Sequence, residues 1–144
     1  MKAKAYLELQ KRQQKEFDEF PIAYAFNEKQ LEQALEKLGA TKDECVTVLN
    51  CGDVLKKSDV PALYKMLRRH REEIYELLKD KQAAEEAFFY EMFNHEYAIN
   101  LSGDEDVLDC FGLTVDKLDE MGLRDVYLSA RRKYMKRAEE LGII

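Results

Sequence analysis

The residues with the clearest chemical potential are Glu91 and His95, which stand at positions i and i+4, with Asn94 beside them. On a helix these positions share a face, so the carboxylate can hold one tautomer of the imidazole, as general bases and metal ligands require. His95 is open to three interpretations: a structural histidine, a ligand-binding residue or a metal ligand. Because two side chains are too few for zinc and no HExxH pattern completes the set, the sequence predicts no metal site.

The pair lies within residues 83–100, AAEEAFFYEMFNHEYAIN, which hold the densest aromatic cluster in the chain. Read at 3.6 residues per turn, one face carries Phe88, Met92, His95 and Ile99, and the next carries Phe89, Phe93 and Tyr97. So wide an apolar arc predicts a central helix over 83–99 that is covered on several sides. Polar groups inside such a helix need partners, and this conflict between polarity and burial indicates a functional segment.

Other parts of the chain supply side chains that suit a phosphate-bearing ligand. Cations bind phosphate groups and aromatic rings stack on a base, so a pocket for a nucleotide-type ligand needs both. We therefore predict a ligand-binding set, at a subunit interface, that consists of Glu91, Asn94, His95, Tyr97, Tyr24, Lys56, Arg69 and Arg71. No residue is assigned a catalytic role. His70, between Arg69 and Arg71, is expected in an exposed basic turn.

The remaining pattern predicts a mainly α (α+β) fold, a compact helical domain around the central aromatic-rich helix with a small β-hairpin. A length of 144 residues suits one domain, 1–144. Helical spacing of apolar residues recurs in the ranges 2–19, 28–38, 60–79, 104–111, 115–121 and 123–141. Residues 22–26 are extended, and β-branched residues in 46–49 predict a strand that turns at 50–53 and returns over 54–56.

Several functional classes are not supported. The chain contains neither GxxxxGK[ST] nor GxGxxG, so the common phosphate-cradling loops are absent and no cofactor is predicted. Cys45, Cys51 and Cys110 show no CxxC spacing, which makes reduced thiols the expectation. A Cys–His pair assembled in space, for instance Cys51 with His95, stays open. The N-terminus lacks the apolar core of a signal peptide and no uncharged run exceeds eight residues, so we expect no membrane segment and a cytoplasmic location.

Charge is distributed unevenly along the chain, whose formal net charge is -6. Acidic residues dominate from Glu85 to Glu120, where Lys117 is the only basic side chain, and basic clusters lie before and after this block. Neutralisation between packed helices explains such a pattern, but an acidic surface for a basic partner is an alternative. Because cations and aromatics are not interleaved and the net charge is negative, nucleic-acid binding is not expected.

Several motifs together resemble a known group of proteins. They are Tyr90-Glu91-Met92-Phe93-Asn94-His95-Glu96-Tyr97, Gly103-Asp104, Leu108-Asp109-Cys110-Phe111-Gly112-Leu113-Thr114 and the segments around Gln13-Gln14, Phe20-Pro21, Phe26-Asn27 and Lys37-Leu38-Gly39. Over roughly residues 10–120 the chain resembles small uncharacterised prophage and mobile-element proteins of Gram-positive bacteria that carry an Asn-His-Glu-Tyr helix motif. The resemblance implies an accessory protein of a phage or mobile element.

These observations lead to an expected function with two alternatives. We expect a non-enzymatic anti-defence protein that binds and sequesters a small nucleotide-type signalling ligand in a pocket. The first alternative is an inhibitor that blocks a host defence protein through the acidic residues Asp104, Glu105, Asp106 and Asp109. The second is a small hydrolase that uses His95 and Glu91. Apolar residues on the first helix (Tyr6, Leu7, Leu9) and at the end of the chain (Leu141, Ile143, Ile144) also predict a homo-oligomer.

Overall fold

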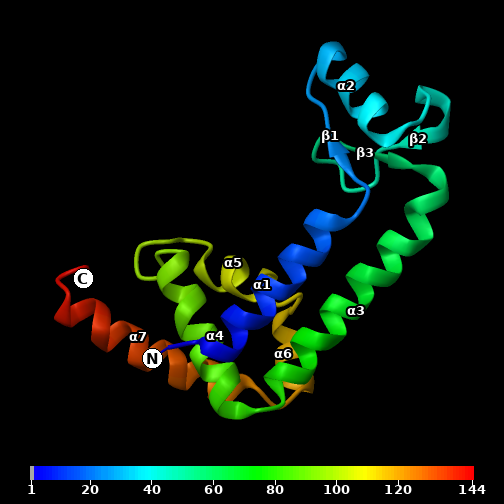
Figure 1. The fold of residues 1–144 in the computed structure, drawn as a ribbon. Coiled ribbons are helices and arrows are strands. Elements are labelled where there is room, and N and C mark those ends of the chain that lie inside the picture. The colour runs from blue at the N-terminus through cyan, green and yellow to red at the C-terminus, as the bar shows by residue number, and fades with distance from the viewer. Residues whose placement is uncertain (1) are drawn as a thin grey trace. The chain divides into compact units, whose positions relative to one another are not determined.

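The computed structural model describes residues 2–144 and contains, over these residues, seven α-helices and a three-stranded antiparallel sheet (Figure 1). The helices are α1 (Lys4–Glu19), α2 (Glu28–Leu38), α3 (Val60–Leu78), α4 (Lys81–Asn94), α5 (Gly103–Asp109), α6 (Val115–Glu120) and α7 (Arg124–Glu140). The strands are β1 (Ala23–Tyr24), β2 (Cys45–Val46) and β3 (Asp53–Lys56), and short 3-10 helices η1 (Lys42–Glu44) and η2 (Lys57–Asp59) precede β2 and α3. The predicted fold class, mainly α with a small β element, is confirmed.

The chain divides into two compact units whose boundaries fall inside α1 and α3. We call Met1–Lys11 with Arg71–Ile144 the helical unit, and Arg12–His70 the sheet unit. Each unit has apolar side chains buried within it. That the whole chain folds as one domain stays a prediction. None of the helices in residues 2–144 is long and apolar enough to cross a membrane.

The sheet unit is built on β3, the middle strand of the order β1-β3-β2, which pairs antiparallel with both neighbours. The predicted hairpin between β2 and β3 is present, with Val46 opposite Leu55. Its first strand, however, ends at Val46 and does not reach Leu49, as the β-branched run had suggested. Strand propensity therefore predicted the presence of β2 correctly but overestimated its length.

A buried carboxylate explains the short strand. Asp53, which has no exposed surface, accepts backbone N–H groups from Val48 at 2.8 Å, Leu49 at 3.0 Å and Cys51 at 3.3 Å. Because these N–H groups donate to the Asp53 side chain, they do not form hydrogen bonds between strands, and β2 ends before them. Burial alone would raise the pKa of the Asp53 carboxyl, but the hydrogen bonds from Leu49, Val48 and Cys51 outweigh burial and hold the pKa below its ordinary value.

Apolar residues fill the sheet unit on both sides of β3. The buried members are Ile22, Leu55, Leu63 and Met66 in one cluster and Ala23, Ala34 and Val54 in the other. The end of α1 is tied to α3 by a hydrogen bond from Gln13 Nε2 to the carbonyl of His70, 2.9 Å long. His70 is only 8% exposed and its Nε2 lies 3.1 Å from Glu16 Oε2, so the expected exposed basic turn is wrong. The imidazole of His70 points inward because Glu16 on α1 provides a hydrogen-bonding partner there.

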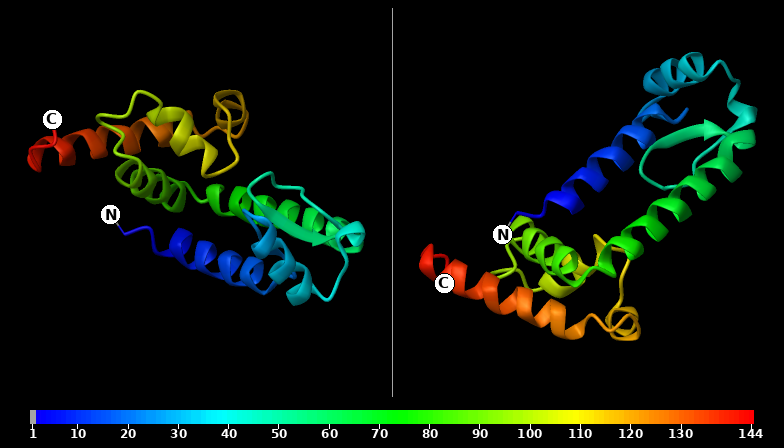
Figure 2. Two further views of the ribbon diagram at one scale, coloured as in Figure 1. Left: turned by 90° about the horizontal axis from the view of Figure 1, so that it is seen from above. Right: turned by 60° about the horizontal axis from the view of Figure 1, so that its bottom comes forward.

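In the helical unit α7 packs against α4, as Figure 1 and the two views of Figure 2 show. The fully buried ring of Phe88 lies edge-on to Phe111, with centroids 5.0 Å apart, and to Tyr127, at 5.2 Å. The predicted central role of the aromatic stretch therefore holds for α4 within this unit. Tyr6, expected to need a neighbouring subunit, is 1% exposed because its ring packs on Phe111 at 5.1 Å.

The central helix ends earlier than its apolar pattern suggests. α4 stops at Asn94, and Glu96 has a positive φ of 50°, which breaks the helix. The N–H of Ala98 donates to the hydroxyl of Tyr134 at 3.0 Å, so at this residue a tertiary hydrogen bond takes the place of a helical one. Ile99, predicted on the buried face, is 65% exposed as a result.

Exposed apolar residues remain at the end of the helical unit. Leu141, Ile143 and Ile144 are 51%, 44% and 55% exposed, and Leu7 on α1 is 37% exposed. Such residues are available to a second copy of the chain. Self-association stays a prediction, to be tested by light scattering at micromolar concentration.

Candidate functional site

The predicted Glu91–His95 pair forms in the structure. The carboxylate of Asp80 caps α4 by accepting from the backbone of Gln82 and Ala83 at 3.0 and 3.1 Å. About one turn before its end, α4 directs Glu91 into the core, where it is 2% exposed. His95 follows as the residue that ends the helix, and its Nε2 lies 3.2 Å from Glu91 Oε2.

Cys110, at the end of α5, is the third member of this cluster. Its Sγ lies 3.1 Å from His95 Nε2 and 3.0 Å from Glu91 Oε2. The thiol also donates to the carbonyl of Asp106 at 3.3 Å. Two segments of the helical unit, the end of α4 and the end of α5, therefore bring a nitrogen, an oxygen and a sulfur together. We refer to Glu91, His95 and Cys110 as the three-ligand cluster.

The cluster is not arranged as a nucleophilic relay. In such a relay the imidazole uses one nitrogen for the acid and the other for the nucleophile. Here Glu91 and Cys110 both lie at Nε2 of His95. Burial, reinforced by the nearby Glu91 carboxylate, raises the pKa of the Cys110 thiol to about 12, so the thiol is protonated at neutral pH. This geometry does not favour the hydrolase alternative.

Further side chains hold the cluster in place. The buried hydroxyl of Tyr6 hydrogen-bonds to Glu91, and burial followed by the charge of Glu91 raises the pKa of this tyrosine. Gln10 Nε2 donates to the same hydroxyl at 2.6 Å. Asn100 Nδ2 donates to the carbonyl of His95 at 3.0 Å and to Asp106 Oδ2 at 2.8 Å, which ties the turn after α4 to α5. The positions of these three side chains are thus supported by contacts outside the cluster.

The other predicted site residues are distributed between the two units. Within the helical unit Asn94 is an exposed residue at the end of α4, and Tyr97 lies in the following turn. Arg71 is placed next to Gly112, where a Cβ would make a tight contact of 3.2 Å with Arg71 Nε. Gly112 also has a positive φ of 64°, which favours glycine. The structure therefore brings Glu91 and His95 together, and directs Tyr97 and Arg71 to different neighbours.

The remaining predicted residues belong to the sheet unit. Tyr24 is 45% exposed on β1, and Lys56 ends β3 opposite Cys45. Arg69 forms an ion pair with Glu16 across α1 and α3. The role of these three residues in ligand binding stays a prediction.

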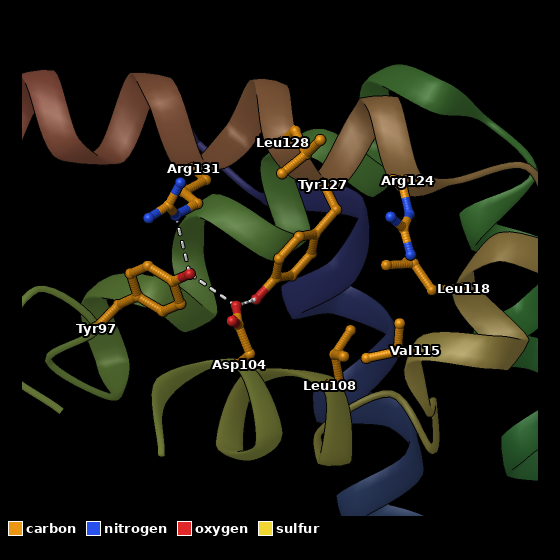
Figure 3. A pocket seen from close by; sticks show the side chains of 9 residues that line it. All are labelled: Tyr97, Asp104, Leu108, Val115, Leu118, Arg124, Tyr127, Leu128 and Arg131. Atoms are coloured by element: carbon orange, nitrogen blue, oxygen red, sulfur yellow. Dashed lines mark hydrogen bonds between the residues drawn. The ribbon is translucent and has the colours of Figure 1, made fainter. Parts of the chain in front are cut away.

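A pocket of about 220 Å³ lies in the helical unit between α5, α6 and α7 (Figure 3). Helix α7 supplies one wall through residues at i, i+3, i+4 and i+7, which share a face: Arg124, Tyr127, Leu128 and Arg131. The opposite wall is mainly apolar and consists of Leu108, Val115 and Leu118. Figure 3 shows the ring of Tyr127 across the middle of the pocket, with Arg131 and Arg124 toward opposite ends.

One end of this pocket carries a chain of hydrogen bonds. The hydroxyls of Tyr97 and Tyr127 donate to Asp104 Oδ1 at 2.7 and 2.6 Å, and Arg131 Nε donates to the Tyr97 hydroxyl at 3.1 Å (Figure 3). Burial, reinforced by the Asp104 carboxylate, raises the pKa of both tyrosines, so they remain donors at neutral pH. At the other end the guanidinium of Arg124 is engaged by both oxygens of Asp119, at 2.6 and 2.7 Å. Arg131 is therefore the cation with more capacity for a ligand.

Sequence reasoning identified Tyr97 but missed Arg131, Tyr127 and Cys110. The i, i+3, i+4, i+7 spacing on α7 was a usable signal, because it puts two cations and an aromatic ring on one helix face. Cys110 gave no such signal. It is separated from His95 by the turn and α5, and only the tertiary fold closes that separation to 3.1 Å.

These features define a class: a mainly helical protein with a small antiparallel sheet, a polar cluster in its core and a pocket on the face of its last helix. Within that class the chain belongs to the family of unknown function DUF7659, whose model matches residues 5–133. No curated protein and no solved structure matches the chain. The match includes residues of both units and every residue named in the two candidate sites.

Proposed function

We propose that the protein is a non-enzymatic binding protein that sequesters a small nucleotide-type ligand in the pocket on α7. The observation that supports this most directly is the pairing of opposite charges at one end of a pocket with an apolar wall. A carboxylate, Asp104, and a guanidinium, Arg131, are joined there through the Tyr97 hydroxyl. Such a site suits a ligand that carries both N–H donors and an anionic group.

The recognition of a base would fall to Asp104 and the apolar wall. Both tyrosine hydroxyls donate to Oδ1, which leaves Oδ2 to accept from the N–H groups of a ring. The ring of Tyr127 and the leucines Leu108 and Leu118 offer apolar surface for a flat ligand. A volume of about 220 Å³ is at the small end of ligand sites, which favours a single base over two stacked bases.

The recognition of phosphate would fall to Arg131. Its Nε is used by Tyr97, and the planar guanidinium has four further N–H groups that can bind an oxyanion in two-pronged geometry. A second, more open depression of about 380 Å³ shares Tyr97, Asp104 and Arg131 with the first. A base in the first and a phosphate over the second would use both sides of Arg131.

The biological setting proposed for this binding rests on the resemblance to mobile-element proteins. Removal of a signalling nucleotide would protect such an element from a host defence system. The alternative that uses the acidic surface has less support, because Asp104 and Asp106 already accept hydrogen bonds from Tyr97, Tyr127 and Asn100. Acidic side chains engaged in this way are less available to a basic partner.

Native mass spectrometry of the protein purified from cells tests the proposal, followed by calorimetry with a panel of mononucleotides and cyclic nucleotides. We expect a small anionic mass that denaturation releases unchanged, and affinity that falls with added salt. Arg131→Gln should weaken binding by about tenfold or more, because a charge-assisted contact is lost. Arg132→Gln is the matched control, since Arg132 is exposed on the same helix and should leave affinity unchanged.

Three outcomes would count against sequestration. A ligand recovered with an altered mass would indicate an enzyme. A stoichiometric host protein in place of the small mass would favour the protein-blocking alternative. If Arg131→Gln and Arg132→Gln changed the affinity equally, the ligand would not bind in the α7 pocket.

A further inference from the structure

We propose that the three-ligand cluster is a binding site for a transition-metal ion of the Zn²⁺ type. Each residue presents one donor atom, and all three atoms converge: Glu91 Oε2, His95 Nε2 and Cys110 Sγ lie 3.0 to 3.2 Å from one another. The donors come from the ends of α4 and α5 within the helical unit. This site is independent of the proposed ligand pocket on α7.

The distances are close to those that a metal ion would require. In a tetrahedral zinc site, with bonds of about 2.0–2.3 Å, neighbouring ligand atoms lie roughly 3.4–3.6 Å apart. The three separations in the cluster are 3.2, 3.1 and 3.0 Å. An outward movement of a few tenths of an ångström per atom is therefore sufficient, and side-chain rotation can supply it.

The donor types select the ion. Mg²⁺ and Ca²⁺ prefer oxygen ligands, whereas a thiolate with an imidazole and a carboxylate suits Zn²⁺ and related transition metals. A dipositive ion would also balance the carboxylate of Glu91 and the thiolate of Cys110 inside the core. Binding replaces the thiol proton, which is released to the solvent.

The surroundings support the ligands in the way that metal sites require. Glu91 hydrogen-bonds to the Tyr6 hydroxyl, which Gln10 holds in turn. Asn100 donates to the carbonyl of His95 and to the carboxylate of Asp106, and Asp106 lies on α5, one turn before Cys110. Such outer contacts orient ligands and tune their affinity.

An ion can reach the cluster from solvent. The side chain of His95 is 31% exposed, whereas that of Glu91 is 3% exposed. The imidazole therefore lies at the entrance and the carboxylate at the inner end. Three protein ligands leave the fourth position of a tetrahedral ion open to water at this entrance.

Titration of the chelator-treated, reduced protein with Co²⁺ tests the inference, because Co²⁺ replaces Zn²⁺ and reports a bound thiolate by absorption. We expect saturation at one ion per chain, with a thiolate-to-cobalt charge-transfer band and the visible bands of tetrahedral Co²⁺. Competition with Zn²⁺ should abolish both. Cys110→Ser should remove the charge-transfer band and weaken Zn²⁺ binding by about 100-fold or more.

Matched variants make the result decisive. Cys51→Ser and Cys45→Ser should keep the full signal, since neither thiol belongs to the cluster. His95→Gln, at the exposed entrance, tests the site even if Cys110→Ser fails to fold. Arg131→Gln should bind Co²⁺ normally, so failure of the α7 pocket and failure of the metal site are distinguishable. A wild-type protein without a saturable thiolate band, or a band that persists in folded Cys110→Ser or His95→Gln, would overturn the inference.

Discussion

Asp53 in the sheet unit and Glu91 in the helical unit are both buried carboxylates, with 0% and 2% exposure, but their neighbours differ in kind. Asp53 accepts backbone N–H groups from the loop before it. Glu91 faces the side chains of His95 and Cys110. One carboxylate organises a backbone, and the other belongs to a group of titratable side chains.

The two buried carboxylates differ in role: Asp53 stabilises a loop, whereas Glu91 contacts side chains that can take part in chemistry. A backbone amide can only donate, so the loop at Asp53 requires an acceptor at that place. An imidazole or a thiol can donate, accept or bind a metal ion. An amide in place of Glu91 can still accept from the Tyr6 hydroxyl and donate to His95 or Cys110, whereas an amide in place of Asp53 leaves a backbone donor without an acceptor.

Matched amide substitutions give the largest expected contrast. Asp53→Asn places an NH₂ group among backbone donors and leaves at least one of them without an acceptor, so it should cost about 2–3 kcal/mol of unfolding free energy. Glu91→Gln should cost about 1 kcal/mol or less, because His95 and Cys110 can accept from the new amide. Urea denaturation of the metal-free proteins, followed by circular dichroism, measures both.

Which of these two variants loses more unfolding free energy tests whether Asp53 and Glu91 differ in role. If Glu91→Gln were the more destabilising, Glu91 would be a structural acceptor like Asp53. Glu85→Gln, which loses an ion pair with the half-exposed Lys133, is a control for removal of a carboxylate near the surface and should change stability by less than about 1 kcal/mol.

The pH dependence of stability should sharpen the contrast. The pKa of Asp53 is lowered in the folded protein, so its stabilising contribution is complete above the ordinary aspartate pKa and is lost as the pH falls through the folded value. The difference in unfolding free energy between wild type and Asp53→Asn should therefore shrink below about pH 4. A difference that stayed constant from neutral to acidic pH would contradict this role of the Asp53 charge.

The smallest expected effect concerns the reactivity of Cys110. Burial and the Glu91 charge raise the pKa of this thiol to about 12, so iodoacetamide at pH 8 should alkylate Cys110 more slowly than the exposed Cys51. Glu91→Gln removes the charge and should increase the rate at Cys110 several-fold. Peptide mass spectrometry of metal-free protein follows each site, and an unchanged rate would show that Glu91 does not control the thiol.

Patterns within single elements were readable from the sequence. The cap at Asn27, which accepts from the backbone of Gln30 at 2.8 Å, the stop of α2 at Gly39 and the i,i+4 pair of Glu91 with His95 all follow from neighbours on one segment. Local hydrogen bonds and helical periodicity decide such features, so they do not need the rest of the fold.

Features that depend on long-range contacts were not readable. The β-branched residues predicted a strand to Leu49, but the N–H groups of Val48 and Leu49 donate to the Asp53 side chain. The apolar pattern predicted a helix to Ile99, but the N–H of Ala98 donates to the Tyr134 hydroxyl in a turn. Cys110 joined Glu91 and His95 only because α5 packs on the end of α4. The sequence by itself determined the helical class and two of the three residues of the polar cluster, Glu91 and His95. The tertiary structure decided where the helix ends, which sulfur completes the cluster and which of the two pocket arginines is more available to a ligand. These features depend on contacts between side chains from different elements.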